Sequence, residues 1–355
     1  MSNWLTLRGR NHSFQIDRRT LTMILLLIAA NLVAIIVCVG LGSTIISPIA
    51  VIRSLLEAMG LGGASIGESS HSMIIFSLRM PRVIIAVMVG SALAVSGALL
   101  QGIVRNPLTS PDVIGISGGA SLGTIIFILY FSHLSIRFMP ISSIGGAFAA
   151  AFLIYLFAYR RGITPLRLVL IGIGMATALT AVSYMLILTA SFTPTAVAVK
   201  AFTFMTGSIY GVSWERDVLT LLPWIAVLLP VSLLYARHLN VQELGDEVAT
   251  SVGSSVHVKR TILLLVSVAL AGAAVAIGGA INFIGLMAPH MARKLVGPAY
   301  GGVIPVSALI GSLVLLLSDL VARVAFIPLD IPAGVFTAAI GAPFFIYLLY
   351  RHRSS

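Results

Sequence analysis

Long apolar runs separated by short polar segments dominate the pattern along this chain. Nine runs have about the length that a helix needs to cross a bilayer, roughly 20 residues. They lie at 21–41, 83–104, 113–131, 141–159, 167–189, 218–236, 261–281, 303–325 and 332–350, and a shorter run lies at 283–297. Only helices and closed barrels satisfy their backbone groups in lipid, and runs of this length are typical of helices. The pattern predicts an all-α polytopic membrane protein with about ten transmembrane helices.

The distribution of basic residues decides whether the short run 283–297 crosses the membrane. The chain holds 22 Lys+Arg against 11 Asp+Glu, and basic residues gather in short cytoplasmic loops. If the run crosses, both termini are cytoplasmic and 15 of the 22 basic residues lie inside; otherwise the division is 12 against 10. We therefore predict ten crossings, with 1–20 as a cytoplasmic basic segment, 21–350 as one transmembrane domain and 351–355 as a cytoplasmic tail. In that topology seven basic residues face outside: Arg53, Arg79, Arg82, Arg137, Lys200, Arg216 and Arg323.

Composition supports the membrane class. Hydrophobic residues make up 58% of the 355 positions and charged residues only 9%, which excludes a soluble domain of ordinary composition. The single cysteine, Cys38, lies inside an apolar run. It can form no internal disulfide, and packing is its simplest role.

Two polar loops are longer than a hairpin requires. Residues 42–80 on the outer face are rich in Gly and Ser and predict a mobile loop with a short helix at 48–59. Residues 237–260 form the main polar segment on the inner face. Within it Leu244, Val248 and Val252 recur at helical spacing, and Gly253 can end the helix. A short surface helix there would offer a docking face to a cytoplasmic partner.

Small residues recur at every fourth position of the run 83–104, namely Ala86, Gly90, Ala94, Ala98 and Gly102. In lipid such a stripe allows helix backbones to approach closely. The run 270–280, LAGAAVAIGGA, has the same character. Both patterns predict helices at the centre of a tight bundle.

Catalytic motifs are scarce in this chain. None of the three lysines follows Gly and precedes Ser or Thr, so no Walker-type phosphate loop can form, and no His precedes a Glu, so the HExxH zinc motif is absent. The segment 115–119, GISGG, matches the nucleophile-elbow pattern of serine hydrolases, with Ser117 as nucleophile and His290 as a distant base. An elbow needs a strand before the serine, and the sequence predicts helices throughout, so an intramembrane protease is the weaker interpretation.

Ionisable residues at membrane depth are costly and often functional. Asp319 and Arg323 stand four apart on one helix, a spacing that predicts an ion pair. Asp319 and His290 could alternatively titrate in a proton-coupled secondary transporter. Arg79, Arg82 and Arg323 together would surround the outer mouth, where they could receive acidic groups.

Seven motifs, in this order, resemble the permease subunits of ABC importers for iron-siderophores, haem and cobalamin. They are SLRMPR at 77–82, LLQGIVRNPLTSPDVIGISGGASLG at 99–123, FMTGSIYGVSWERD at 204–217, LGDEVATSVG at 244–253, FIGLMAPHMARKLVG at 283–297, LSDLVAR at 317–323 and IPAGVFTAAIGAPFFIYLL at 331–349. The stretch NPLTSPDVIG is most similar to the ferric-siderophore branch, in particular to ferric enterobactin permeases. The resemblance extends from about residue 40 to the C-terminus.

The resemblance implies a type II importer permease with ten helices in the cytoplasmic membrane, which is not itself an enzyme. ATP and Mg²⁺ would be bound by separate ATPase subunits, and this chain would bind no cofactor or metal. A substrate-binding protein would deliver the ferric siderophore from outside, and a second permease subunit, a sister chain rather than a second copy, would complete the pathway. Haem and cobalamin remain alternative substrates, and a proton-coupled transporter the more distant one.

The same resemblance assigns roles to particular residues. The family's outer arginines correspond to Arg79, Arg82 and Arg323, which would dock the binding protein. Its cytoplasmic gate corresponds to Asn106, Leu108 and, by a weaker match, Thr164. The coupling helices that contact the ATPase correspond to about 241–258, with Leu244, Gly245, Glu247, Ala249 and Gly253 as the coupling residues. As a hypothesis of mechanism, substrate would then pass along a dimer-interface channel lined by small and weakly polar side chains from spans such as 83–104 and 167–189.

Overall fold

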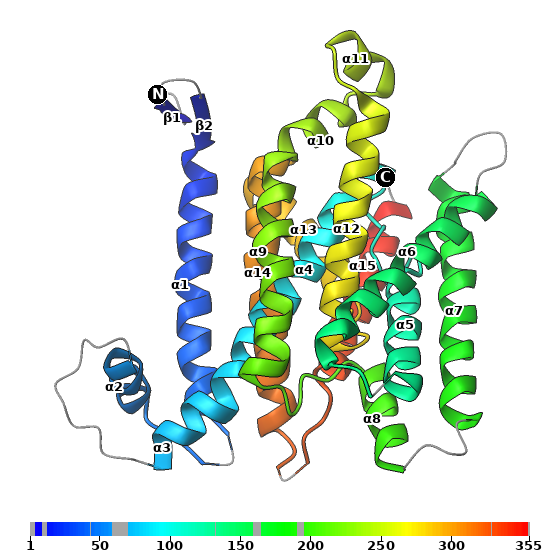
Figure 1. The fold of residues 1–355 in the computed structure, drawn as a ribbon. Helices are drawn as coiled ribbons and strands as arrows, with labels where there is room; N and C mark the ends of the chain where they lie inside the picture. The colour runs from blue at the N-terminus through cyan, green and yellow to red at the C-terminus, as the bar shows by residue number, and fades with distance from the viewer. Residues whose placement is uncertain are drawn as a thin grey trace.

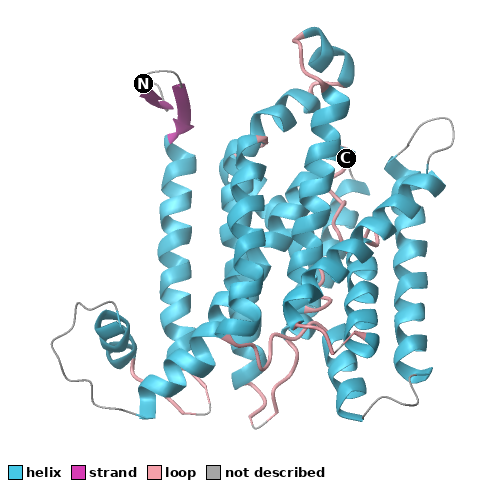
Figure 2. Ribbon diagram, viewed as in Figure 1, coloured by secondary structure: helices cyan, strands magenta, loops and turns pink. Residues whose placement is uncertain are grey.

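Helices that run roughly side by side make up almost the whole molecule (Figures 1 and 2). The computed structural model describes residues 4–8, 13–42, 44–58, 70–131, 133–158, 165–189, 195–327 and 329–353. The first part of the chain forms β1 Trp4–Arg8, β2 Ser13–Asp17, α1 Arg18–Gly40, α2 Pro48–Ala58, α3 Ser70–Met73, the π-helix η1 Ile74–Arg79, α4 Met80–Val104, α5 Ile116–Tyr130, the 3-10 helix η2 Ile136–Phe138, α6 Met139–Ala158 and α7 Pro165–Thr189. The remainder forms α8 Thr195–Met205, the π-helix η3 Trp214–Val218, α9 Leu219–Leu234, α10 Ala236–Glu243, α11 Asp246–Ser251, α12 Val256–Gly278, α13 Ile284–Val296, α14 Tyr300–Val324 and α15 Ala333–Arg353.

Every apolar run expected to cross the membrane contains a helix. Seven helices within the described residues are long and apolar enough to span a bilayer. The helices Ile116–Tyr130 and Ala333–Leu348 are apolar but shorter, and α13 has 13 residues. The helical polytopic class is therefore confirmed, whereas ten crossings stays a prediction.

Helix α4 lies at the centre of the bundle, as the stripe of small residues predicts. Of the most apolar 18-residue stretch of the helix Ile74–Val104, 89% is buried. Gly90 faces α14 so closely that an added Cβ would lie 2.4 Å from the carbonyl oxygen of Gly311. At Gly97 the same atom would lie 1.9 Å from the carbonyl oxygen of Gly285 on α13. Only a residue without a side chain fits at these two contacts.

Helix α12 is the second most buried of the long helices, since 78% of its most apolar 18-residue stretch is buried. Ser96 of α4 and Ser267 of α12 exchange hydrogen bonds, because each hydroxyl donates to the other residue's carbonyl oxygen, at 2.8 and 2.9 Å. Ser143 of α6 donates to the carbonyl oxygen of Gly272 at 2.8 Å. Buried serine hydroxyls thus donate to backbone carbonyls of neighbouring helices in the bundle.

Three local expectations were wrong or incomplete. The loop predicted over 42–80 contains α2, as expected, but residues 70–80 continue as α3, η1 and the start of α4, so the apolar helix runs over Ile74–Val104. A β-hairpin precedes α1, with Trp4 paired to Asp17 and Arg8 to Ser13, although the composition predicts helices alone. Helix α8 was not foreseen, because its 11 residues are too few to register as a span.

The burial of α4 bears on the predicted lining of the pathway, which stays a prediction. A channel between two subunits needs side chains on an exposed face, and α4 is enclosed by its own neighbours. In α7 only 17% of the most apolar 18-residue stretch is buried. Helix α15 exposes Val335, Ile340 and Ile346. Of the two runs expected to line the channel, the one that forms α7 is by far the more exposed in this chain.

The functional segments gather at two opposite ends of the bundle (Figure 1). At one end lie α10 and α11, and both ends of the chain lie toward the same side; we call it the α11 end. At the other lie α2, α3, α8 and the connection between α14 and α15, and we call this the α3 end.

Candidate functional site

Arg82 holds together the helices of the α3 end. Its guanidinium donates from Nε to both carboxylate oxygens of Asp319 on α14, at 2.9 and 3.0 Å. Its two terminal nitrogens donate to Asp330, in the connection to α15, at 2.6 and 2.8 Å. The ring of Tyr210 lies 5.8 Å from the guanidinium carbon. With its side chain only 9% exposed, Arg82 links α4, α14 and two loops.

Arg79 fills a different role at the same end. It is 5% exposed and donates to the carbonyl oxygens of Val39, Gly40 and Thr44, at 2.6 to 3.0 Å. These carbonyls lie at and just beyond the C-terminus of α1, where helical acceptors have no partner inside the helix. A cation there satisfies them and fixes α1 to η1.

Arg323 and Asp319 do not form the ion pair that their spacing predicts. Within the described residues Asp319 is bound by Arg82, whereas Arg323 donates from Nη2 to the carbonyl oxygen of Cys38 at 2.6 Å. The Nε of Arg323 is buried and has no hydrogen-bond partner among the described residues. The bidentate contact from α4 replaces the local pair because it satisfies both oxygens of a buried carboxylate.

At the α11 end, the predicted surface helix is present as α11. Gly245, with φ of 108°, separates α10 from α11, and Gly253, with φ of 78°, follows the helix. Leu244, Val248 and Val252 are 67%, 46% and 69% exposed, so the apolar ridge faces outward as expected. Among the other residues assigned to coupling, Glu247 is exposed and Ala249 is buried at 0% against the rest of the chain.

Asp246, the first residue of α11, carries the charged contacts of this helix. It accepts from Arg260 of α12 at 2.8 Å and from Arg105, the residue at which α4 ends. The hydrogen bond from Arg260 is the main cause that holds the pKa of the Asp246 carboxyl below its usual range; burial opposes it, and the hydrogen bond from Arg105 adds to the lowering. The carboxylate is therefore ionised at neutral pH.

The loop that follows Arg105 contains two of the three residues assigned to the gate. Arg105 adopts a left-handed backbone with φ of 55°, and the side-chain oxygen of Asn106 accepts from the backbone N–H of Leu108 at 3.0 Å. The N–H of Thr109 donates to the carbonyl oxygen of Asn106 at 3.2 Å. The loop therefore begins as a tight, internally bonded turn. The third gate residue, Thr164, lies outside the described residues.

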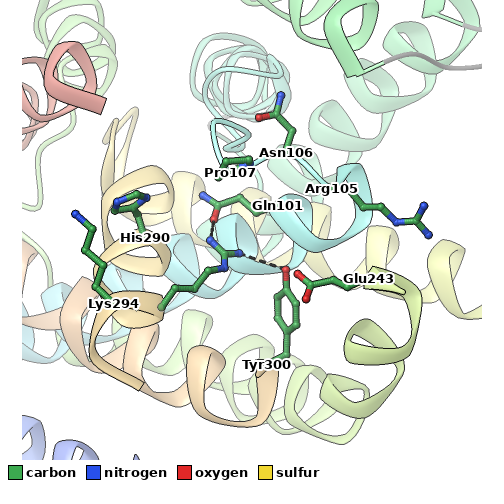
Figure 3. Close-up of a pocket in the computed structure, with 9 residues that line it drawn as sticks. Gln101, Arg105, Asn106, Pro107, Glu243, His290, Lys294 and Tyr300 are labelled. Carbon is green, nitrogen blue, oxygen red and sulfur yellow. Dashed lines mark hydrogen bonds between the residues drawn. The ribbon is translucent and has the colours of Figure 1, made fainter. Parts of the chain in front are cut away.

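A pocket of about 540 Å³ opens beside this turn, between the ends of α4, α10, α13 and α14. Figure 3 shows Gln101, Tyr300 and Glu243 converging on one side of it, with Arg105 directed away. Arg293 donates to Gln101 Oε1 at 2.5 Å and to the Tyr300 hydroxyl at 3.3 Å. The backbone N–H of Tyr300 donates to Asn240 Oδ1 at 2.8 Å. These bonds connect α4, α13, α14 and α10.

The residues proposed for a protease do not form a hydrolytic site in this structure. Ser117 lies at the start of α5 and is 4% exposed. The strands of the described residues lie at 4–8 and 13–17, so no strand precedes the serine as an elbow requires. His290 lines the pocket at the α11 end, whose lining does not include Ser117.

Sequence reasoning missed Asp330, Asp246, Arg105 and Arg260. Each forms its ion pair with a residue distant in the chain, up to 248 positions for Arg82 and Asp330, so local spacing carries no signal. One clue was available for Asp246. It stands between two residues assigned to coupling, and the chain has only 11 acidic residues, which makes each one a candidate partner for the arginines nearby.

Helical spans with charged residues gathered at both ends define a polytopic membrane protein with a connected, buried core. The profile of the FecCD transport family matches residues 26–351. The chain is 41% identical to a protein of Bacillus subtilis described as "Probable siderophore transport system permease protein YfhA", over 96% of this chain and 97% of the relative. It is 40% identical to the achromobactin transport system permease CbrC of Dickeya dadantii over 99% of its length and 98% of the relative.

Two further comparisons bear on the branch and the fold. The ferric enterobactin transport system permease FepG of Escherichia coli is 36% identical, over 95% of this chain and 98% of the relative. A solved structure described as a metal-chelate type ABC transporter in an inward-facing conformation matches with a TM-score of 0.76 and 28% identity. The match covers 93% of this chain and 99% of the other. The chain belongs to the FecCD transport family.

Proposed function

We propose that this chain is the membrane-spanning permease subunit of an ATP-driven ABC importer that moves ferric siderophores across the bacterial cytoplasmic membrane. The observation that carries the proposal is the family match over residues 26–351, joined by siderophore permeases of nearly equal length at 40 to 41% identity. The higher identity to these two relatives than to the ferric enterobactin permease favours the siderophore class as a whole over that single chelate.

The α11 end is proposed to face the cytoplasm, with ten crossings and both termini on that side. The basic residues Arg105, Arg260, Arg293 and Lys294 all lie in the segments that meet there. Basic residues next to membrane spans are retained on the cytoplasmic side. The α3 end is then the outer mouth.

Three kinds of partner follow from this proposal. The exposed ridge Leu244, Val248 and Val252 would insert into a separate ATPase subunit, where ATP and Mg²⁺ are bound, because this chain has no Walker-type loop. A second permease subunit would cover the exposed face of α7. We favour a homologous sister subunit over a second copy for that position.

The outer arginines remain our candidates for docking the substrate-binding protein, and their geometry sets conditions on that role. Arg82 would have to exchange Asp330 for a carboxylate of the partner, because its outer nitrogens are occupied. Arg79 would have to release three carbonyl oxygens. Arg323 is the least constrained, since its Nε has no hydrogen-bond partner among the described residues.

The test is uptake of radioactive iron chelate into proteoliposomes. The chain would be reconstituted with its sister permease and ATPase subunits, and the binding protein would be added outside. We expect uptake that requires ATP and the binding protein and is abolished by an inactive ATPase. Uptake that persists without ATP under a proton gradient would instead establish a secondary transporter.

A further inference from the structure

The segment that contains α10 and α11 is connected to the end of α4 by two routes of different character. The first is partly buried: Asn240 of α10 accepts from the backbone N–H of Tyr300 at 2.8 Å, and the Tyr300 hydroxyl and Gln101 both accept from Arg293. Tyr300 is 0% and Gln101 2% exposed. A connected, partly buried set of hydrogen bonds resists rearrangement, so we expect α10 to move together with the ends of α4 and α14.

The second route begins after Gly245, and it is accessible to solvent. Nothing lies within 4 Å of the position where a Cβ would stand on Gly245, and its φ of 108° belongs to glycine. The side of Gly245 on which a side chain would stand is therefore open, at a backbone conformation that glycine adopts most readily. Beyond the junction, the described ion pairs of α11 with the bundle run through Asp246, whose side chain is 48% exposed.

Asp246 reaches the start of the loop assigned to the gate. Its partner Arg105 is the last residue before Asn106, and the turn over Asn106, Leu108 and Thr109 is internally bonded. A displacement of Arg105 is therefore carried into that turn instead of being absorbed by it. Arg260 holds the same carboxylate from α12, which keeps it oriented toward α4.

We propose that Asp246 is a positioning residue that transmits movement of α11 to the loop 105–115 through Arg105, with Gly245 as the pivot and α10 as the fixed base. The inference rests on the proposed function, because it supplies the connection between the ATPase contact and the gate. Asp246 contacts neither ATP nor substrate. Its effect is on the coupling of two sites, a quantity separate from either activity.

The experiment uses the complete transporter in proteoliposomes and measures two rates, ATP hydrolysis and chelate uptake. Their ratio reports coupling. The variants are Asp246→Asn, Arg105→Gln and the double variant, with Asp246→Glu as the conservative change. Glu57→Gln is the matched control, because it removes the carboxylate of another exposed ion pair, Arg53–Glu57 at 3.1 Å, at the opposite end.

We expect each single variant to lower uptake per ATP about tenfold, within the usual range of coupling between two sites. Uptake per ATP in the double variant should fall no further than in the single variants, because both substitutions break the same contact, that between Asp246 and Arg105. Asp246→Glu should restore most of the ratio, and Glu57→Gln should leave it unchanged. An assembled complex with normal ATP hydrolysis shows that a lowered ratio does not arise from loss of the ATPase.

Two outcomes would overturn the inference. One is an unchanged ratio in Asp246→Asn; the other is a double variant whose loss is the product of the single losses, since the two residues would then act independently. In both cases wild-type uptake would still depend on ATP, so the proposed function would stand. Absence of ATP-driven uptake in the wild type would refute the proposed function itself.

Discussion

Both ends of this membrane protein have an arginine and aspartate cluster, but the two clusters differ in burial. At the α3 end Arg82 is enclosed between Asp319 and Asp330, with the Asp319 side chain 3% exposed. At the α11 end Asp246 lies between Arg105 and Arg260 and is 48% exposed. A buried ion pair cannot lose one partner without leaving an uncompensated charge, whereas an exposed pair exchanges easily with water. The first arrangement suits a fixed fastening, and the second a solvent-accessible connection between two segments that move.

The largest expected effect comes from breaking the buried cluster. Asp319→Asn should lower the free energy of unfolding by about 3 kcal/mol, because it breaks a buried ion pair and leaves Arg82 with the carboxylate of Asp330 alone. Thermal unfolding of the purified protein in detergent measures the loss. Glu57→Gln is the control and should change stability by less than about 0.5 kcal/mol. A loss in Asp319→Asn as small as that of the control would show that the cluster is not a fastening.

Asp330→Asn separates fastening from docking at the same arginine. Because the Asp330 side chain is 25% exposed, we expect a smaller loss of stability, about 1 kcal/mol. The outer nitrogens of Arg82 would then be available to a carboxylate of the binding protein. Affinity for that protein, measured by surface binding at low salt, should rise. Unchanged or weaker affinity would mean that Arg82 does not receive a partner's carboxylate.

Raised salt should weaken the exposed cluster more than the buried one, although its effect should be smaller than that of the substitutions above. Raising the ionic strength from about 0.1 to about 1 M shortens the screening length from about 10 to about 3 Å, and exposed charges are screened far more than buried ones. Uptake per ATP should therefore fall while the unfolding temperature of the core changes little. Asp246→Asn should remove most of the salt dependence of the ratio. If the variant kept that dependence, the sensitive contact would lie elsewhere.

The smallest expected effect is that of pH on the Asp246 contact. The neighbouring arginines lower the pKa of this carboxyl in the folded protein, so its contribution is complete above the pKa of the unfolded chain and is lost as the pH falls through the lower, folded value. Uptake per ATP should thus be constant from about pH 8 to about pH 5. Half-exposure of the group keeps the associated stability small. A fall in the ratio between pH 7 and pH 6 would assign the titration to another group.

The pattern of hydrophobic residues predicted most of the helices, whereas the positions of the charged residues predicted few of the contacts at the site. Helix positions follow from periodicity and length, and the stripe from Ala86 to Gly102 identified the central helix, because close packing in lipid demands small residues along the chain itself. Asp319 was assigned to Arg323 for the same local reason. Its actual partner, Arg82, is 237 positions away, and only the packing of α4 against α14 brings the two together.

Two further features show that periodic apolar positions were predicted and long-range polar contacts were not. Leu244, Val248 and Val252 face solvent, as a helical repeat in a polar segment predicts. Nothing in the sequence indicated that Arg79 would lie 5% exposed against carbonyl oxygens. Backbone acceptors at a helix end leave no mark on the pattern of side chains, so a cation that satisfies them cannot be told from one that faces water.

The contacts at Gly90 and Gly97 have a consequence for the membrane that houses this subunit. The centre of the bundle is closed by backbone resting on backbone, 2.4 and 1.9 Å from where a side chain would begin, and opening it would require moving whole helices apart. A copy inserted before its partners arrive is therefore expected to be electrically silent. A cell that produces this chain in excess of its partners should keep its ion gradients, and a planar bilayer containing the subunit alone should show no added conductance.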